Sequence, residues 1–350
     1  MRIGIISFWQ RSGFGYSALD IRKVFLKYNH TVCVLTRNRE DRLNEEFNCI
    51  SDVSYYTEKN IPVDIIKYWI KKNNLTHCIF IGSDSKKELD DILYIQRRLK
   101  LSSNPDIKFI SIPMWENVED VGKYHFFDRI ICPTKKCKEV FKKYFNAVYV
   151  KWGFDEDIFF PLHKEFNNTI KIFHPVGKDT EDDLSGKVPS LKGFLRKNRI
   201  KVDDKGNLHP EFLLYVHTHL RNGDQPENYN LGNMIIGKQN LSRGEMAILY
   251  QSADICLLPS KVEGLGLSFL EALGTGLPII TIDEAPMNEY VVHKETGYLC
   301  DRENLENNID SALQYFEDKA TMRVLKQNVL SIREEWSWKN NGEKLMRAIL

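Results

Sequence analysis

The chain has 350 residues, which at about 150 residues per domain predicts two domains, each large enough to bury its own core. Its 42% hydrophobic and 28% charged residues are typical of globular proteins and exclude a disordered or collagen-like chain. Because 49 basic residues face 48 acidic ones, the net charge is +1, and the chain as a whole lacks the electrostatic signature of binding to nucleic acid or anionic lipid.

Cysteine usage and apolar runs indicate the compartment. The seven cysteines are odd in number and form no C-x-x-C pair, which favours reduced thiols over a disulfide framework or a zinc site. The apolar stretch at the start is too short for a signal peptide, and no window approaches the roughly 18 apolar residues of a membrane span. We therefore expect a cytoplasmic protein.

Short apolar runs alternate with amphipathic stretches along the first half of the chain. This is the pattern of parallel strands connected by helices, so the predicted fold class is α/β. The expected strands are residues 3–7, 32–36, 78–82, 108–112, 129–132 and 148–150.

A basic amphipathic helix is predicted over residues 134–145. Its apolar positions recur at helical spacing, and Thr134 stands where an N-cap is expected. The lysine face opposite can make peripheral contact with an anionic membrane, although a solvated face is the commoner origin of such a run. The apolar positions are Cys137, Val140, Phe141, Tyr144 and Phe145, and the lysines are Lys135, Lys136, Lys138, Lys142 and Lys143.

The second half begins after a polar, proline-containing stretch, residues 159–168, which is the expected connection between domains. Ser242 and Glu245 predict a capping box at the start of a later helix. The expected strands of the second sheet are residues 170–173, 212–216, 234–236, 254–258 and 278–282. The predicted organisation is a first domain at 1–162, a second at 163–335, and a last helix, 336–350, that packs back on the first domain.

The stretch EGLGLSFLE, residues 263–271, follows the predicted strand 254–258 and leads into a helix. In open parallel sheets, ligands bind outside the carboxyl ends of the strands, next to helix N-termini. Gly264 and Gly266 let backbone N–H groups approach an anion without a Cβ in the way. A diphosphate would suit this position.

Two glutamates flank this glycine loop. Glu263 stands at its entrance and Glu271 one turn into the helix, so both carboxylates can accept hydrogen bonds from sugar or ribose hydroxyls. The alternative is that Ser268 and Glu271 form a capping box and that the glycines only turn the chain.

The region around the loop resembles a known family. The sequence PSKVEGLGLSFLEALGTGLPII resembles the signature of retaining glycosyltransferases of the two-domain GT-B fold, in particular family 4, whose E-x7-E motif has the same spacing of glutamates. FDRIICPTKKCKEVF and WGFDEDIFFP resemble the family's first-domain strand and helix and its interdomain turn. GEMAILYQSADICLLPS and APMNEYVVHKETGYL resemble the passages on either side of the motif. The resemblance covers nearly the whole chain and implies two Rossmann-like domains whose parallel sheets face each other across a cleft.

The family pattern assigns roles to residues of this sequence. It assigns Glu263 to the donor sugar and Glu271 to the nucleotide ribose. In the first domain it assigns Gly13 and Gly15, in a turn after the first strand, to a loop that faces the donor phosphates and the acceptor. The backbone that faces the phosphates corresponds to Gly264, Leu265, Gly266 and Leu267.

The family also sets a basic pair against the diphosphate, and here the match is weaker. We assign this role to Lys178 and Lys187, with Lys192 nearby in the sequence. The alternative is that they are solvated lysines beside an acidic loop.

A first-domain histidine of many relatives has no counterpart here, because Trp115, Glu116 and Asn117 occupy the corresponding stretch. We assign Glu116 a polar role towards the sugar or the acceptor, and Trp115 can stack on a sugar face. A core tryptophan with a surface glutamate beside it is the alternative.

Asp155 and Asp157 imitate the D-x-D metal motif of other sugar transferases, but they fall inside the interdomain turn, and we predict a structural role for them. The sequence shows no His/Asp/Glu cluster at metal spacing. We therefore expect no metal, and expect lysines and helix N-termini to meet the charge of the leaving diphosphate.

The resemblance implies transfer of a hexose from a UDP- or GDP-sugar to an acceptor hydroxyl, with retention at the anomeric carbon and no further cofactor. The acceptor can be a glycan, a lipid or another hydroxyl compound, and nucleic acid, although disfavoured by the charge balance, stays open as an acceptor. The alternatives are a nucleotide-sugar epimerase, a sugar phosphorylase, and a non-catalytic sugar-binding subunit, the last disfavoured by the intact Glu263 and Glu271.

Overall fold

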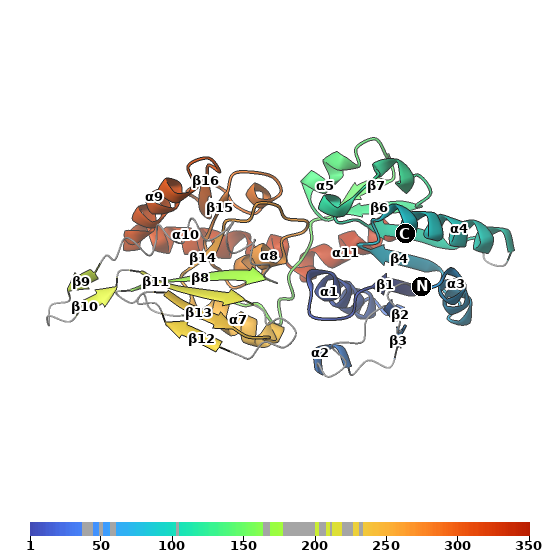
Figure 1. The fold of residues 1–350 in the computed structure, drawn as a ribbon, viewed down its shortest axis with the longest axis horizontal. Helices are drawn as coiled ribbons and strands as arrows, with labels where there is room; N and C mark the ends of the chain where they lie inside the picture. Colours follow the sequence, from blue (N-terminus) through green and yellow to red (C-terminus); the bar gives the residue numbers. More distant parts are fainter. Residues whose placement is uncertain are drawn as a thin grey trace. The chain divides into compact units, whose positions relative to one another are not determined.

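The chain forms two compact units, each built on its own seven-stranded sheet (Figure 1). Unit 1 comprises Met1–Gly153 and Trp338–Leu350, and unit 2 comprises Phe154–Ser337. The predicted α/β class is confirmed for both. The computed structural model describes residues 1–36, 45–48, 52–56, 61–102, 105–163, 169–177, 200–202, 208–210, 212–218, 227–230 and 234–350.

The sheet of unit 1 is parallel throughout, in the order β3-β2-β1-β4-β5-β6-β7. Its central strands are buried along almost their whole length, because helices cover both faces and leave no solvated side for polar residues. The strands are β1 (Arg2–Ser7), β2 (Thr31–Thr36), β3 (Val53–Tyr55), β4 (His77–Ile81), β5 (Lys108–Ile112), β6 (Arg129–Cys132) and β7 (Ala147–Tyr149).

The helices of unit 1 pack in pairs. The C-terminal helix α11 contacts α1 and β6, while α3 contacts α4. Trp338, the first residue of α11, packs edge-on against Trp152 with ring centroids 5.0 Å apart. The helices are α1 (Gly13–Lys27), α2 (Glu45–Asn48), α3 (Val63–Lys72), α4 (Lys86–Ser102), α5 (Lys135–Val140) and α11 (Trp338–Ile349), with 3-10 helices η1 (Trp115–Asn117) and η2 (Val121–Tyr124).

The basic helix predicted over residues 134–145 is shorter than expected. Thr134 caps it as predicted, accepting from the Cys137 N–H at 3.0 Å, but α5 ends at Val140. Turns connect the end of α5 to β7, which starts at Ala147. Phe145 lies in this connection and is 97% exposed instead of packing on the sheet.

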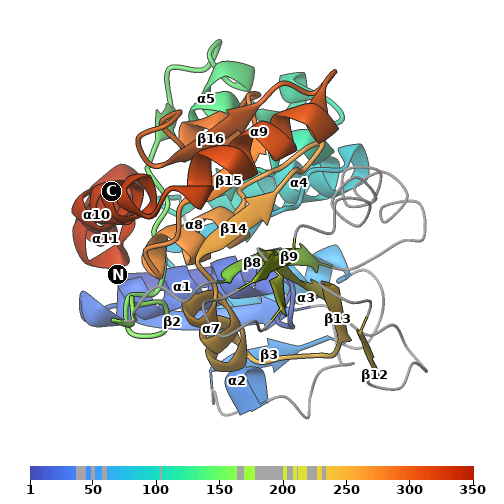
Figure 2. The same ribbon diagram turned by 90° about the vertical axis from the view of Figure 1, so that its left-hand side faces the viewer.

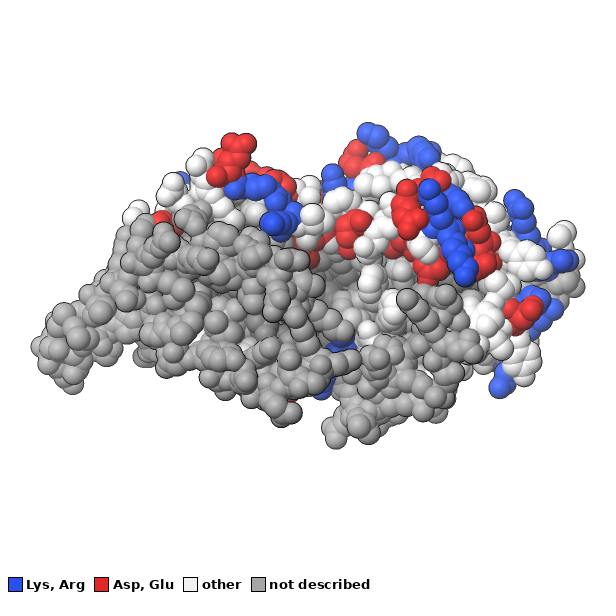
Figure 3. Space-filling model, viewed as in Figure 1, with Lys and Arg blue, Asp and Glu red and all other residues white. Residues whose placement is uncertain are grey.

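At least four of the five lysines of this segment make contacts within unit 1, among them Lys143, whose ammonium lies 5.2 Å from the Tyr144 ring centroid. Lys138 donates to the Ala147 carbonyl at 2.6 Å, Lys142 pairs with Glu139, and the Lys136 ammonium lies over the Trp115 ring. On the described part of the face in Figure 3, basic and acidic side chains are interspersed. Contact with a membrane stays a prediction.

The sheet of unit 2 has the order β12-β13-β11-β8-β14-β15-β16 and is parallel except for its edge strand β12. Figure 2 shows β8, β14 and β15 side by side. The strands are β8 (Ile170–Gly177), β11 (Phe212–Thr218), β12 (Glu227–Asn230), β13 (Met234–Lys238), β14 (Ile255–Leu258), β15 (Ile279–Ile282) and β16 (Gly297–Cys300), with a separate antiparallel pair, β9 (Ile200–Val202) and β10 (Leu208–Pro210).

The predicted capping box opens α7 of unit 2. The Ser242 hydroxyl accepts from the Glu245 N–H at 3.3 Å, and the Glu245 carboxylate accepts from the Ser242 N–H at 2.8 Å. The helices of unit 2 are α7 (Arg243–Ser252), α8 (Leu267–Gly274), α9 (Leu305–Glu317) and α10 (Lys319–Ile332), with 3-10 helices η3 (Met287–Glu289) and η4 (Arg333–Trp336).

The first and last residues of unit 2 are adjacent. Phe154 forms a parallel β-bridge with Ser337, and the Phe154 N–H donates to the Trp336 carbonyl at 2.8 Å. Asp155 follows in a turn, where its carboxylate accepts from the Asp157 N–H at 3.2 Å. This bond within the turn agrees with the structural role predicted for Asp155 and Asp157.

Candidate functional site

The glycine loop of unit 2 leads directly from β14 into α8, as the sequence predicts. Glu263 and Gly264 are half-buried, whereas Leu265 and Gly266 are buried. The loop therefore lies at the carboxyl end of a central strand, with β8 and β15 on either side. In parallel sheets this is the edge at which ligands bind.

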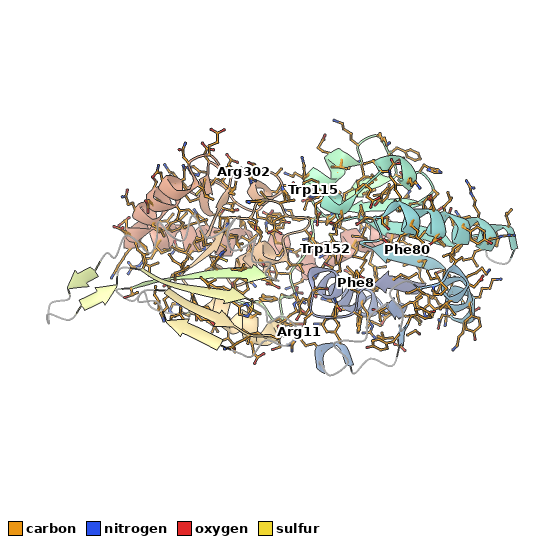
Figure 4. All side chains as sticks on the ribbon, viewed as in Figure 1. Phe8, Arg11, Phe80, Trp115, Trp152 and Arg302 are labelled. Carbon is orange, nitrogen blue, oxygen red and sulfur yellow. The ribbon has the colours of Figure 1, made fainter. Side chains whose placement is uncertain are left out.

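Two side chains from later in the chain hold the loop. The Arg302 guanidinium donates to the Lys261 carbonyl at 2.7 Å and pairs with Glu284 at 2.5 Å (Arg302 is labelled in Figure 4). The Tyr290 hydroxyl makes a short hydrogen bond to the Leu265 carbonyl. The carbonyls of Lys261, just before the loop, and of Leu265, within it, are thus bound by side chains from later in unit 2.

Gly266 is the N-cap of α8 and adopts a left-handed conformation, with φ of +73°. A glycine at the N-cap provides no side chain to occupy the free N–H groups of the first helical turn. Such N–H groups, together with the positive end of the helix dipole, can bind an anion. Phe269, one turn on, stacks on Tyr290 with centroids 5.0 Å apart and fixes the direction in which the helix starts.

Because α8 starts at Leu267 after Gly266, Ser268 is not an N-cap, and the alternative of a Ser268–Glu271 capping box is wrong. Glu271 is only 9% exposed and lies beside the buried phenol of Tyr250. Burial raises the pKa of Tyr250 well above its usual range, and the negative Glu271 raises it further. Interactions with the Ser268 and Glu271 side chains also act on the Tyr250 phenol: Ser268 lowers its pKa and Glu271 raises it.

The predicted basic pair cannot be placed. Lys178 and Lys187 lie outside the described residues, as does Lys192. The structure describes Glu263, the loop backbone and Glu271, whose roles towards the donor stay a prediction, as do those of the lysines assigned to the diphosphate.

In unit 1 the predicted turn after β1 forms the start of α1. Ser12 is its N-cap and accepts from the Gly15 N–H at 3.2 Å. A Cβ at Gly15 would lie 2.0 Å from the Gln10 carbonyl oxygen, so only glycine fits there. A Cβ at Gly13 would meet no atom within 4 Å among the described residues, which leaves space for a ligand at the helix start.

Trp115 and Glu116 form η1, immediately after β5. Trp115 is half-buried, packs against the core of unit 1, and has the Lys136 ammonium 5.1 Å from its ring centroid (Figure 4). Glu116 is exposed. The core contact predicted as one alternative for Trp115 is confirmed, and the catalytic role of Glu116 stays a prediction.

Asp84 is a buried carboxyl group that the sequence analysis missed. It follows β4, is 3% exposed, and accepts from the Tyr124 hydroxyl at 2.6 Å and from the Met114 N–H at 3.2 Å. Burial raises its pKa to about 7, with Glu116 and Glu88 adding to the rise and the two hydrogen bonds opposing it. A lone Asp between Gly-Ser and Ser reads as a solvated turn, and no sequence signal indicates its burial.

A pocket of about 230 Å³ lies near the carboxyl ends of β1 and β4. Its apolar part includes Ile6 and Phe80, and its polar part includes Ser83, Ser85 and Glu88. β1 and β4 are the neighbouring strands at which the chain order of the sheet reverses, the position at which open α/β sheets bind ligands.

In the described part of the chain, no group of three or more His, Cys, Asp or Glu side chains is arranged to hold a metal ion. No helix in that part combines the length and the apolar character that crossing a membrane requires.

The sequence of unit 2 matches known glycosyltransferases. Residues 223–330 match the family model of "Glycosyl transferases group 1". A protein of Haemophilus influenzae named "Uncharacterized glycosyltransferase" is 35% identical over 103 residues, 26% of this chain and 29% of that protein. The chain covers less than a third of the length of the curated relatives it matches.

Solved structures of low sequence identity share the fold of the whole chain. Sucrose-phosphate synthase from Thermosynechococcus elongatus has a TM-score of 0.75 at 14% identity, covering 99% of this chain and 98% of that one. Anabaena HepE in complex with UDP and glucose has a TM-score of 0.72 at 11% identity, with coverage of 99% and 98%. The predicted resemblance to glycosyltransferases of the GT-B fold is confirmed.

Gly266→Ala should destabilise the loop, because a Cβ there requires an unfavourable left-handed conformation and would lie 3.0 Å from the Phe269 ring. We expect a loss of about 1 to 2 kcal/mol in the free energy of unfolding of unit 2, measured by hydrogen exchange. Gly244→Ala is the matched control, because a Cβ there meets nothing within 4 Å and a helical alanine should be neutral or stabilising. Equal destabilisation by both variants would contradict the special role of Gly266.

Asp84 should make unit 1 less stable as the pH rises. Its folded pKa of about 7 exceeds the ordinary 3.8, so the folded chain keeps a proton that the unfolded chain loses between pH about 4 and about 7. Over that window its contribution to the free energy of unfolding falls, by about 1.4 kcal/mol per pKa unit, and above it stays constant. We therefore expect Asp84→Asn to raise the melting temperature relative to wild type more at pH 8 than at pH 4.5.

The matched control is Asp90→Asn, which removes an exposed carboxylate on α4 that pairs with Lys123 at 2.5 Å. It should shift the melting temperature little and equally at both pH values. An Asp84→Asn difference that does not change with pH would contradict the raised pKa.

Proposed function

We propose that the protein is a retaining glycosyltransferase that moves a hexose from a nucleotide-diphosphate sugar to an acceptor hydroxyl. The observation that carries the proposal is the loop between β14 and α8, whose glycine N-cap leaves helix N–H groups available between Glu263 and Glu271. The matches to glycosyltransferases over residues 223–330 support the same conclusion.

The donor binds to unit 2 in this proposal. Its diphosphate accepts hydrogen bonds from backbone N–H groups of residues 264–267, at the positive end of α8. Glu271 accepts from the ribose hydroxyls and Glu263 from hydroxyls of the hexose. Lys178 and Lys187 supply the positive charge that the helix end alone provides only in part.

The difficult step is the departure of the nucleoside diphosphate, which leaves positive charge on the anomeric carbon. N–H groups and lysines aimed at the departing phosphate oxygen stabilise the charge that develops there. The acceptor oxygen bonds to the anomeric carbon on the same face, and its proton passes to the leaving phosphate. The configuration is retained without a covalent enzyme intermediate.

The acceptor side is proposed on unit 1. The turn at Gly13 and the exposed Glu116 follow β1 and β5, on either side of β4, so both belong to the carboxyl edge of one sheet. The pocket at the ends of β1 and β4 has an apolar part and hydroxyl and carboxylate groups, features that suit an acceptor with both apolar and hydroxyl groups.

Binding and turnover with UDP- and GDP-sugars test the function. Calorimetry shows whether either nucleoside diphosphate binds, and NMR of the products shows whether the anomeric configuration is retained. Turnover without an acceptor that interconverts sugars would indicate an epimerase, a requirement for inorganic phosphate would indicate a phosphorylase, and binding without turnover would indicate a sugar-binding subunit.

Glu271→Gln should weaken binding of the bare nucleoside diphosphate. A charge-assisted hydrogen bond to ribose is worth about 1.5 to 3 kcal/mol, so we expect Kd to rise roughly 10- to 100-fold in calorimetry. Glu303→Gln, an exposed glutamate of the same unit, is the control and should leave Kd unchanged. Equal affinity in wild type and Glu271→Gln would remove the ribose role from this residue.

Glu263→Gln should lower turnover more than it lowers affinity for the bare nucleotide, because its proposed partner is the transferred sugar. We expect a fall in kcat/KM of about tenfold or more with a nearly unchanged Kd for the nucleoside diphosphate. Parallel losses in both measurements would mean that Glu263 supports the loop and does not bind the hexose.

A further inference from the structure

The buried carboxyl of Asp84 connects three segments at the carboxyl edge of unit 1. Asp84 itself follows β4, the Met114 N–H that it accepts from belongs to the segment after β5, and the Tyr124 hydroxyl comes from η2. Tyr124 is fully buried and packs edge-on against Phe141 with centroids 4.7 Å apart. Its hydroxyl therefore has little freedom to find another partner.

The segment held by Asp84 is the one that carries Glu116. The Pro113 carbonyl accepts a weak hydrogen bond from the Cys137 thiol at 3.8 Å, and the Met114 N–H is fixed by Asp84 at 3.2 Å. Lys136 of α5 lies over the ring of Trp115. The bond from the Met114 N–H to Asp84 thus fixes the backbone two residues before Glu116.

The groups that face Asp84 interact differently with its ionised and its protonated form. Tyr124 on η2 and Met114 donate to it, Glu116 on η1 and Glu88 on α4 repel it, and Cys137 on α5 is a neutral thiol whose pKa is raised partly by Asp84. An ionised Asp84 can accept from Met114 and Tyr124 at once. When it is protonated, one oxygen becomes a donor and the contact with Tyr124 loses its charge assistance.

We propose that Asp84 is a positioning residue for glycosyl transfer: its ionised carboxylate holds Met114 and Tyr124 so that Glu116 is set at the carboxyl edge, and protonation loosens this arrangement. The inference rests on the proposed function, because the first test of it measures the rate of glycosyl transfer. The proposed function assigns the nucleoside diphosphate to unit 2, whereas Asp84 belongs to unit 1, so we expect binding of the nucleoside diphosphate to be independent of Asp84.

The test compares wild type with Asp84→Asn over pH 5.5 to 8.5. Wild-type kcat should rise through pH about 7, as the carboxylate forms, and Asp84→Asn should lack this rise because an amide does not titrate. At pH 8 the variant should be about tenfold slower, and the Kd for UDP or GDP should match wild type. Asp90→Asn should retain the wild-type profile, since Asp90 makes only an exposed ion pair with Lys123.

A second measurement does not need turnover. The fluorescence difference between wild type and Trp115→Phe reports the segment 113–117, and it should titrate near pH 7 in wild type but not in the Asp84→Asn background. Tyr124→Phe removes a hydrogen bond that lowers the pKa of Asp84, so it should move this midpoint to higher pH. This variant keeps the proposal testable if Asp84→Asn fails to fold.

The outcomes separate the positioning role from the proposed function. Transfer by Asp84→Asn with the wild-type kcat and pH profile would overturn the positioning role while the proposed function stands. If wild type transfers no sugar but the Trp115 signal titrates and is lost in Asp84→Asn, the proposed function fails and the link from Asp84 to Trp115 is upheld. A Trp115 signal that does not titrate, or titrates equally in Asp84→Asn, would overturn that link.

Discussion

A parallel sheet that is covered by helices on both faces leaves its strand ends as the places where polar groups of the sheet can meet a ligand. Both units of this chain obey that constraint, and their candidate residues follow from it. In unit 2 the glycine loop follows β14, and in unit 1 the turn at Gly13, Asp84 and Glu116 follow β1, β4 and β5 in the order in which these strands lie side by side.

The glycine loop of unit 2 shows which features of this edge would suit an anion. Tyr290 and Arg302 bind carbonyl groups of the loop, so its acceptors are used within the protein. Gly266 ends the loop in a conformation that brings no capping side chain. No side chain caps the N–H groups of the first turn of α8, and in the proposed function these groups bind the diphosphate while the two glutamates bind hydroxyl groups of the nucleotide sugar.

Much of this arrangement can be predicted from the sequence, because it depends on local patterns. The strand before the loop, the glycines and the helix after it are adjacent in the chain, and so is the capping box of Ser242 and Glu245. Contacts between distant segments could not be predicted. Nothing near the loop indicates that Tyr290 and Arg302 hold it, and a lone Asp84 becomes buried only because Tyr124 and Met114 fold onto it. The helix over 134–145 was predicted too long because helical spacing alone does not show where the next strand begins, and β7 starts at Ala147.

The central claim is that a nucleoside diphosphate binds to the backbone at the start of α8, and hydrogen exchange of the backbone amides measures this most directly. The amides of residues 264–268 should exchange more slowly when UDP or GDP is added, because the phosphate oxygens take their N–H groups as donors. Protection should be lost or reduced in Gly266→Ala, which disturbs the loop, and kept in Gly244→Ala. If UDP or GDP binds to the protein but the exchange of residues 264–268 is unchanged at a saturating concentration, the nucleotide binds elsewhere and the account is contradicted.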